Sequence, residues 1–250
     1  MAIGTPVDVY NNADKASGAT DAVTISVAVP AGSTIVACYS VDGDGADSSG
    51  AIESVTDVSG NTYQLAAAAS TGTTNAGVAA GIYYAKNVAA LAANDNITFN
   101  FIGSSAPTAS AHSIFYVTGL DSTSPLDVTG TATGTSTTPS VSTSATTTQA
   151  DVLTIGIVGT EGPSGDTFTQ DASPAYATPP VRAGTTSGSA VTNITVAGGY
   201  FIETAAGVKT YNPTLGTSRD WASVIVTFKG AAASKAFPFR RPSFNHILVR

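Results

Sequence analysis

The stretch Asp57–Leu65, DVSGNTYQL, indicates how this chain folds. Its centre, Gly60-Asn61, is a dipeptide that turns tightly, because both residue types adopt positive φ angles at low cost. Val58 and Tyr63 stand on either side, and β-branched and aromatic residues favour extended strands. The stretch therefore predicts a β-hairpin.

The same combination of short apolar or alternating runs and turn residues recurs along the chain. Further turn signals are VPAGS, AANDN and AGGY, and no long segment has the apolar stripe of a helix. We expect strands at Pro6–Tyr10, Val23–Val29, Thr34–Val41, Ile52–Asp57, Thr62–Ala67, Gly77–Ala85, Asn96–Phe101, Ala111–Thr118, Val152–Val158, Ile194–Glu203 and Trp221–Lys229. Their number and spacing predict an all-β fold, a two-sheet antiparallel sandwich of jelly-roll or Ig-like type.

Bulky side chains are sparse among the Ala, Val, Ser and Thr residues of this chain, so its aromatic residues are expected in the core. Where two aromatic residues are neighbours in a strand they face opposite ways, which predicts that one of each pair points outward. The residues concerned are Tyr83, Tyr84, Phe99, Phe101, Phe115, Tyr116, Phe201 and Trp221.

Charge is scarce and unevenly distributed. Charged residues make up 11% of the 250, and the net charge is −7 with a pI near 4.5. An acidic chain lacks the basic face that phosphate binding needs, so nucleic acid is not expected as a partner. Residues 231–250 contain four basic residues and no Asp or Glu, which leaves −11 for residues 1–230 once these four charges are subtracted from −7.

Two segments bear on domain organisation. The Thr- and Ser-rich stretch Gly130–Ala150 is consistent with a linker between two domains, but its β-branched residues at alternate positions favour exposed edge strands within one sandwich. The Pro- and Gly-rich residues 161–191 predict long surface loops, the part of the body best suited to touch a ligand. We therefore expect a β-sandwich domain at residues 1–230, followed by an extended C-terminal arm at 231–250.

Several pieces of the chain resemble a β-sandwich module that is common in tailed-phage structural proteins and in bacterial surface proteins. The resemblance spans about residues 20–230 and implies a sandwich fold, but it does not decide between the two kinds of protein. The pieces that carry it are Val55–Tyr63 (VTDVSGNTY), Ile82–Asn87 (IYYAKN), Phe115–Leu120, Pro125–Asp127 and Trp221–Phe228.

The residues that enzymes need are scarce. Cys38 is the single cysteine, which excludes an internal disulfide and a CxxC metal site. His112 and His246 are the only histidines, there is no G-x-S-x-G elbow, and the patterns that bind nucleotide phosphates are absent. His112 is expected as a core or sheet-surface residue. A pair of carboxylates acting as a glycosidase stays open, although nothing selects a pair, so we predict no enzyme and no cofactor.

One acidic cluster deserves comparison with a calcium loop. Asp42, Asp44, Asp47 and Glu53 follow a predicted strand, with a carboxylate eleven residues after the first as in an EF-hand. The match is incomplete, because Ala46 takes a ligand position and no helix pattern flanks the loop. A calcium site is the minor interpretation and a solvated acidic turn the major one.

The basic C-terminal arm combines charge with large apolar groups. Pro238 and Pro242 exclude a helix and restrict sheet pairing, so an extended arm is expected. Exposed apolar and Arg side chains of this kind mark interfaces, although the arm could also fold back as an extra strand. The predicted docking residues are Phe237, Phe239, Arg240, Arg241, Phe244, Ile247, Leu248 and Arg250.

These features lead to two functional hypotheses. The N-terminus has no basic and apolar leader, and no 18-residue apolar run occurs, so neither a signal peptide nor a membrane span is expected. The first hypothesis is a non-enzymatic virion protein, a capsid decoration or a tail or fibre component. Its expected partners are other virion proteins or copies of itself, with a host-surface glycan as a further candidate. The alternative is a carbohydrate-binding or adhesive module of a bacterial surface protein or extracellular filament.

Overall fold

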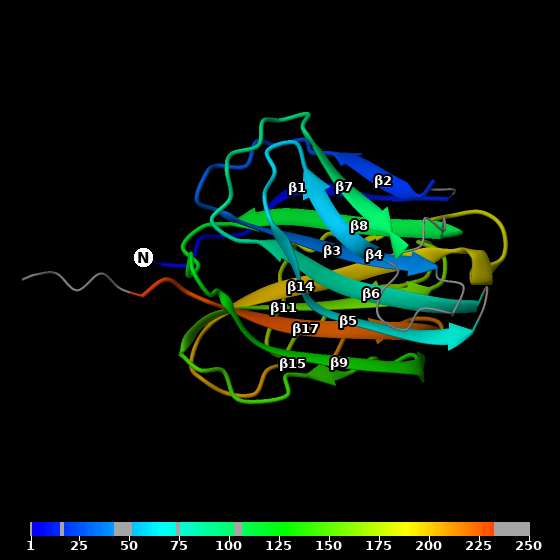
Figure 1. Cartoon of the computed structure of the whole chain (residues 1–250). Helices are drawn as coiled ribbons and strands as arrows, with labels where there is room; N and C mark the ends of the chain where they lie inside the picture. The colour runs from blue at the N-terminus through cyan, green and yellow to red at the C-terminus, as the bar shows by residue number, and fades with distance from the viewer. Residues whose placement is uncertain (1, 16–17, 43–51, 74–75, 103–106, 233–250) are drawn as a thin grey trace, which may run out of the picture.

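The computed structural model describes residues 2–15, 18–42, 52–73, 76–102 and 107–232. Within these residues the fold is an all-β antiparallel sandwich, as expected (Figure 1). Two five-stranded sheets form its body, and a three-stranded sheet covers one of them. The sandwich class was therefore predicted correctly, and the covering layer is an addition.

The sheets are named here by their position in the fold. The central sheet has the order β1 (Val7–Asp14), β8 (Ala109–Val117), β3 (Thr34–Asp42), β6 (Ala76–Ala85) and β5 (Tyr63–Thr73). The C-terminal sheet has the order β13 (Ala183–Gly184), β14 (Ile194–Thr204), β11 (Asp151–Glu161), β17 (Arg219–Lys229) and β9 (Leu126–Ser136). The small sheet has the order β2 (Thr20–Thr24), β7 (Asn96–Phe101) and β4 (Ile52–Asp57).

The central sheet is covered on both faces. One face packs against the C-terminal sheet through residues such as Phe115 and Tyr84, and the other packs against the small sheet through residues such as Tyr83 and Phe99. Every residue of β3 is buried as a result. The expectation that one of two neighbouring aromatic residues points outward was wrong for Tyr83 and Tyr84, because each enters a different core.

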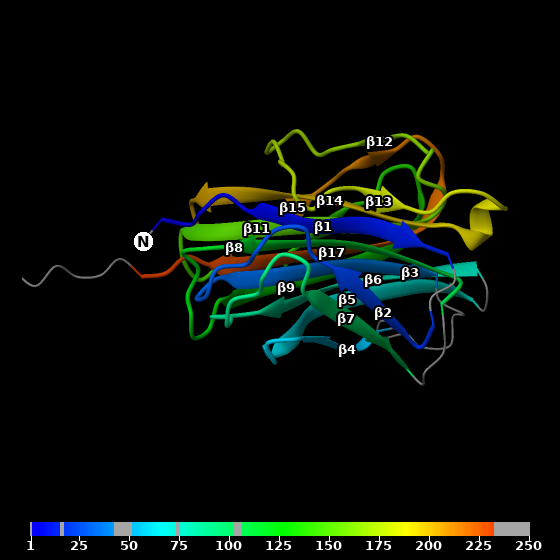
Figure 2. The ribbon, with the colours of Figure 1, turned by 90° about the horizontal axis from the view of Figure 1, so that it is seen from above.

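Loops cover much of the outer face of the C-terminal sheet. They contain the short ladders β10 (Val141–Ser142) with β15 (Thr210–Tyr211) and β12 (Phe168–Thr169) with β16 (Thr214–Leu215), and the 3₁₀ helix η2 (Ala190–Thr192). Beneath them two apolar clusters form, one around Tyr211 and one around Trp221. In Figure 2 the segment with β12 lies on the opposite side of the molecule from β4 and β7 of the small sheet.

The turn at Gly60-Asn61 does not form a hairpin, which corrects the prediction. β4 pairs with β7 in the small sheet and β5 pairs with β6 in the central sheet, so the turn passes from one layer to the next. Asp57 holds this corner: its carboxylate accepts from the Ser59 amide at 2.9 Å, the Asn61 amide at 3.1 Å and the Tyr63 hydroxyl at 3.0 Å. Because these hydrogen bonds run from the turn to its own first residue, the turn forms without pairing between the two strands that flank it.

The Thr-rich stretch belongs to the sandwich. Its first part lies in β9, which pairs with β17 at the edge of the C-terminal sheet, and residues 130–136 of β9 alternate between half-buried and exposed. This confirms the edge-strand interpretation for residues 130–136. The remainder of the stretch is irregular apart from β10. In the part of the chain that the structure describes, no helix has the length and apolar character needed to cross a membrane.

The two ends of the described body lie together. The Gly4 amide donates to the Thr118 carbonyl at 2.9 Å, and the Ala231 amide donates to the neighbouring Gly119 carbonyl at 2.8 Å. β17 starts at Arg219 at the other end of the sheet and runs towards this one. A strand of this length spans about 35 Å, so the molecule has a terminal end, where both chain ends lie, and a distal end near Arg219.

Candidate functional site

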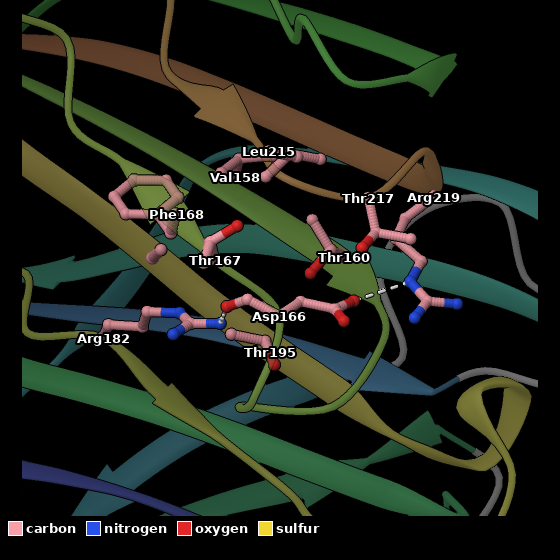
Figure 3. Close-up of a pocket in the computed structure, with 11 residues that line it drawn as sticks. Val158, Thr160, Asp166, Thr167, Phe168, Arg182, Thr195, Leu215, Thr217 and Arg219 are labelled. Carbon is pink, nitrogen blue, oxygen red and sulfur yellow. Dashed lines mark hydrogen bonds and ion pairs between the residues drawn. The ribbon is translucent and has the colours of Figure 1, made fainter.

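A polar hollow opens on the outer face of the C-terminal sheet, near the distal end. We name it the outer-face pocket, and Figure 3 shows it between strands and the loops that cover them. Its enclosed part has room for about one water molecule, and the volume reaches about 280 Å³ only when the open solvent in front of it is included. Its lining consists of Val158, Thr160, Asp166, Thr167, Phe168, Arg182, Thr195, Ala197, Leu215, Thr217 and Arg219.

Strand alternation explains which side chains reach the pocket. On β11, Val158 and Thr160 face outward, whereas Ile157 between the sheets belongs to the main core. The register of the antiparallel ladders then places Thr195 of β14 directly opposite Thr160. The floor of the pocket is therefore a row of alternate residues from adjacent strands.

The pocket contains one ion pair. Arg219 Nε donates to Asp166 Oδ2 at 2.7 Å, and both side chains are about one-fifth to one-quarter exposed. Gly162 makes room for this pair, because a Cβ at residue 162 would lie 2.9 Å from both of these atoms. A second tie holds the same loop, since the Thr195 hydroxyl donates to the Gly162 carbonyl at 2.8 Å.

Arg182 is positioned differently. Its Nη2 donates to the main-chain carbonyl of Asp166 at 2.6 Å, and within the described residues its guanidinium forms no ion pair. Its Nε is buried and has no acceptor. Burial lowers the pKa of Arg182 below the usual arginine value, with Asp166 acting in the opposite direction. The guanidinium is thus a cation that the protein leaves incompletely compensated.

The rest of the lining divides into hydroxyl and apolar groups. The hydroxyls of Thr160, Thr167 and Thr217 make no hydrogen bond to any residue that the structure describes. Phe168 and Leu215 supply apolar surface and pack on the cluster that contains Trp221. Figure 3 shows the Thr side chains between the two arginines.

Part of the pocket lining comes from a segment that the sequence analysis predicted to form ligand-contacting loops. Asp166, Thr167, Phe168 and Arg182 all come from residues 161–191, the segment predicted to hold ligand-contacting loops. The strand residues, with Arg219 among them, were not predicted as site residues. No sequence pattern marks an isolated Arg at the start of a strand as a site residue. Arg219 reaches the pocket only because β17 pairs with strands that are distant in the sequence.

The predicted calcium residues do not come together in the described residues. Asp42 is buried at the end of β3, whereas Glu53 is exposed on β4 of the small sheet. Asp44 and Asp47 lie outside the described residues. Across the described ranges no group of three His, Cys, Asp or Glu side chains has the arrangement of a metal site.

Asp42 instead faces another acid. A Cβ on Gly159 of β11 would lie 2.3 Å from the Ser40 hydroxyl of β3, so these two positions touch across the sandwich. Two residues further along each strand stand Asp42 and Glu161, which are 2% and 6% exposed. One oxygen of each, Asp42 Oδ1 and Glu161 Oε1, has no hydrogen-bond partner among the residues that the structure describes. Burial raises the pKa of Asp42 to about 6 and that of Glu161 to about 7.

His112 lies in the core, as expected. It is 1% exposed, stacks on Phe99 with ring centroids 4.1 Å apart, and its Nε2 lies 2.9 Å from Asp21 Oδ2. The Ser110 hydroxyl donates to the same oxygen, also at 2.9 Å. A serine triad requires the serine to bind the histidine; here both bind one carboxylate, and His112 Nδ1 has no partner within the described ranges.

The arm predicted to dock lies beyond the described residues, which end at residue 232. This applies to every predicted docking residue, namely Phe237, Phe239, Arg240, Arg241, Phe244, Ile247, Leu248 and Arg250.

Comparison of the chain with protein-family models, with curated proteins and with solved structures gave no match. The residues of the pocket and the sequence of the arm are therefore the basis for a functional argument.

Proposed function

We propose that this chain is a non-enzymatic structural protein of a bacteriophage particle, a capsid decoration or a tail or fibre component. In this proposal residues 231–250 dock on other virion proteins or on further copies of the chain. The β-sandwich is then displayed outward. The resemblance to sandwich modules of tailed-phage proteins supports this choice of particle.

One observation carries the proposal: the basic and aromatic residues concentrate in the segment that follows β17. Residues 231–250 contain four of the ten Lys and Arg residues and three of the nine Phe residues, with no acid. This segment leaves the body at the terminal end, because Ala231 is bonded to Gly119 there. Arg and aromatic side chains dominate binding hot spots. Residues 1–230 have a net charge of −11, so the body does not repel the positive charges of this segment.

The test compares the full chain with a chain that ends at residue 232. We expect the truncated chain to fold, with an unchanged β-type circular dichroism spectrum, and to be lost from purified particles assembled in its presence. A second variant, Arg240→Glu with Arg241→Glu, keeps the length and reverses the charge, and it should also reduce incorporation. Arg240→Lys with Arg241→Lys is its control, because it changes the same two residues and keeps both positive charges. Full incorporation of the truncated chain would contradict docking through the arm.

A second function has its own support in the outer-face pocket. An adhesive or carbohydrate-binding module of a bacterial surface protein or filament needs a binding site that faces away from its attachment. The pocket lies near the distal end, about the length of β17 from the exit of the chain. Binding of the full chain to bacterial surface glycans, without incorporation into any particle, would favour this alternative.

A further inference from the structure

The edge strands of the two five-stranded sheets differ in how they are protected. Natural edge strands avoid pairing with other chains through charged side chains, bulges or short length. In the central sheet, β1 has Asp8, Asp14 and a register shift, and β5 has a register shift between Leu65 and Ala67. In the C-terminal sheet, β13 has two residues. β9, at the opposite edge (Figure 1), is eleven residues long and pairs in regular register with β17 from Thr129 to its end.

The main-chain groups of β9 point alternately towards β17 and towards the open side, as in any antiparallel edge strand. Val128 points to β17, because its amide donates to the Thr227 hydroxyl at 3.1 Å and its carbonyl accepts from the same hydroxyl at 3.1 Å. Thr129 points away, because its carbonyl accepts from the Ser144 amide at 2.9 Å. The alternation then turns three further residues to the open side, namely Thr131, Thr133 and Thr135.

We name the amides and carbonyls of these three threonines the free edge. No residue in the described ranges bonds to them from the open side, and all three threonines are exposed. The free edge has a boundary at each end. The Thr129 carbonyl is bonded to Ser144, and the Thr137 carbonyl accepts from the Leu215 amide at 2.8 Å. Thr133 lies midway between these two boundaries.

The layers on either face of β9 leave the free edge accessible. A Cβ on Gly134 would lie 2.7 Å from the Trp221 ring, and Ala132 packs on the same cluster, so these two positions face the covering loops. By strand alternation the three threonines face the side of the central sheet. Because they are exposed there, β5 does not cover them. A strand of another molecule therefore reaches β9 without displacing a described part of the chain.

The charge of this edge suits a second copy of the chain. Residues 128–150 contain no Asp, Glu, Lys or Arg, whereas residues 1–230 have a net charge of −11. Two copies therefore repel each other least where this uncharged segment forms the surface. Asp220 of the neighbouring strand accepts a hydrogen bond from the Thr135 hydroxyl, so its carboxylate is partly compensated.

The symmetry of the free edge suits the same partner. A two-fold axis through Thr133 would place Thr133 opposite its own counterpart and Thr131 opposite Thr135 of the second copy. In this antiparallel register every amide and carbonyl of the free edge has a partner. Threonines that lie opposite each other on antiparallel strands also stabilise the pairing through their side chains.

We infer that a second copy of this chain binds at the free edge, β9 against β9, so that two C-terminal sheets join into one. This surface belongs to the sandwich and goes beyond both proposed functions, neither of which requires it. One short pair of strands buries less than a standard interface, so the dimer is weak and reversible, with a dissociation constant of about 10 µM to 1 mM.

Charge at the two-fold axis tests this pairing in the full chain. Thr133→Lys places two like charges opposite each other, so dimerisation should weaken at least about tenfold, and Thr133→Glu should have the same effect. An equal mixture of the two variants places Lys opposite Glu and should restore association as a heterodimer. Thr56→Lys and Thr56→Glu are the controls, because Thr56 is also an exposed strand threonine but lies on β4 of the small sheet.

Sedimentation velocity from about 1 µM to about 1 mM measures each equilibrium, and circular dichroism checks that each variant folds. A parent chain that stays monomeric over this range would overturn the inference. So would a Thr133→Lys variant that dimerises like the parent, or a mixture that stays monomeric. Arg240→Glu with Arg241→Glu should not change the association, and if it alone abolished dimers, they would form through the arm.

Cross-linking tests the register independently of charge. Thr133→Cys should form covalent dimers with a short bifunctional thiol reagent, since the paired Cα atoms would be about 5.5 Å apart. The native Cys38 is buried and should not compete. Thr131→Cys alone should cross-link poorly, because its counterpart lies four residues along the paired strand, whereas its mixture with Thr135→Cys should cross-link well. Equal yields for Thr131→Cys and Thr133→Cys, or no yield at Thr133→Cys, would contradict pairing about Thr133.

Discussion

At the scale of single residues, Asp42 and Glu161 connect stability to pH. They face each other at the end of the inter-sheet space, and Asp42 adds to the negative charge felt by Glu161. Asp220 adds to the negative charge felt by Glu161, whereas Arg219 opposes it, and Lys15 acts on Asp42. Desolvation is the largest cause of the raised pKa of each acid. The pair holds protons at a pH where exposed carboxylates are ionised.

The sign of the pH dependence follows from these shifts. The folded chain binds protons at Asp42 and Glu161 more tightly than the unfolded chain, so the free energy of unfolding should decrease as the pH rises from about 4 to about 8. Asp42→Asn and Glu161→Gln remove the ionisation. Each should therefore stabilise the fold at pH 8 by about 1 to 2 kcal/mol relative to the parent chain, and by much less at pH 4.5. Urea denaturation at the two pH values measures the difference.

Asp151→Asn provides the matched control for this pH effect. Asp151 stands at the other end of β11 and is exposed, so removing its charge should change the stability equally little at both pH values. If Asp42→Asn and Glu161→Gln were as neutral as this control at pH 8, the two buried acids would not be responsible for the pH dependence.

Asp57 shows how one side chain determines the path of the backbone. Besides its bonds to Ser59, Asn61 and Tyr63, the corner is held from outside, because the Asn61 side chain accepts from the Ala89 amide at 2.7 Å and donates to the Ala89 carbonyl at 3.2 Å. These bonds fix the turn against a neighbouring loop. The short Gly-Asn signal specifies a reversal of direction, and the side-chain bonds around it specify that the next strand joins another sheet.

At the scale of elements, β11 is the strand on which both halves of the C-terminal sheet depend. It pairs with β14 on one side and β17 on the other, and each face is covered, so small residues are needed where another layer comes close. A Cβ on Gly159 would lie 2.3 Å from the Ser40 hydroxyl and 2.8 Å from Ala80 Cβ. The inter-sheet distance at this point is therefore set by a glycine.

Gly159→Ala should destabilise the fold by about 1 to 3 kcal/mol, because the extra methyl group forces the two sheets apart or distorts β3. The control is Gly165→Ala, since a Cβ on Gly165 would meet nothing within 4 Å. It should change the free energy of unfolding by no more than about 0.5 kcal/mol. Chemical denaturation of both variants tests the prediction, and equal stabilities would show that the sheets adjust freely at this contact.

The buried strands also explain what the sequence could and could not predict. The apolar runs of β3 and β11 were recognisable as strands, but a strand that is buried on both faces has no alternation to show which layer lies on each side. The small sheet was therefore not foreseen as a separate layer, and Gly60-Asn61 was assigned to a hairpin. The loops of the pocket were indicated by their Pro and Gly content. Arg219 was not, since its place follows from pairing between distant strands.

At the scale of the whole molecule, the two ends of the sandwich differ in chemistry. The terminal end holds both ends of the described body, through bonds of Gly4 and Ala231 to the segment that follows β8. The distal end holds the outer-face pocket and the pair of buried acids. A body attached at its terminal end would therefore present the pocket outward, which is the arrangement that a displayed binding protein requires.

This polarity can be tested on the particle with engineered thiols. The native Cys38 is buried, and burial raises the pKa of its thiol, so it should not react with a maleimide in the folded chain. Ser122 is exposed at the terminal end, next to Asp121, whose amide donates to the Lys229 carbonyl at 2.9 Å. Ser218 is exposed at the distal end, beside Arg219 of the pocket.

In the free chain, Ser122→Cys and Ser218→Cys should react with maleimide at similar rates, because both sites are accessible. Once the chain is docked on its particle, the rate at residue 122 should fall at least about fivefold, whereas the rate at residue 218 should not change, since only the terminal end enters the interface. Mass spectrometry of the labelled particle measures both rates. Protection of residue 218 with free reaction at residue 122 would mean that the distal end is the docking face, and the proposed orientation of the pocket would have to be reversed.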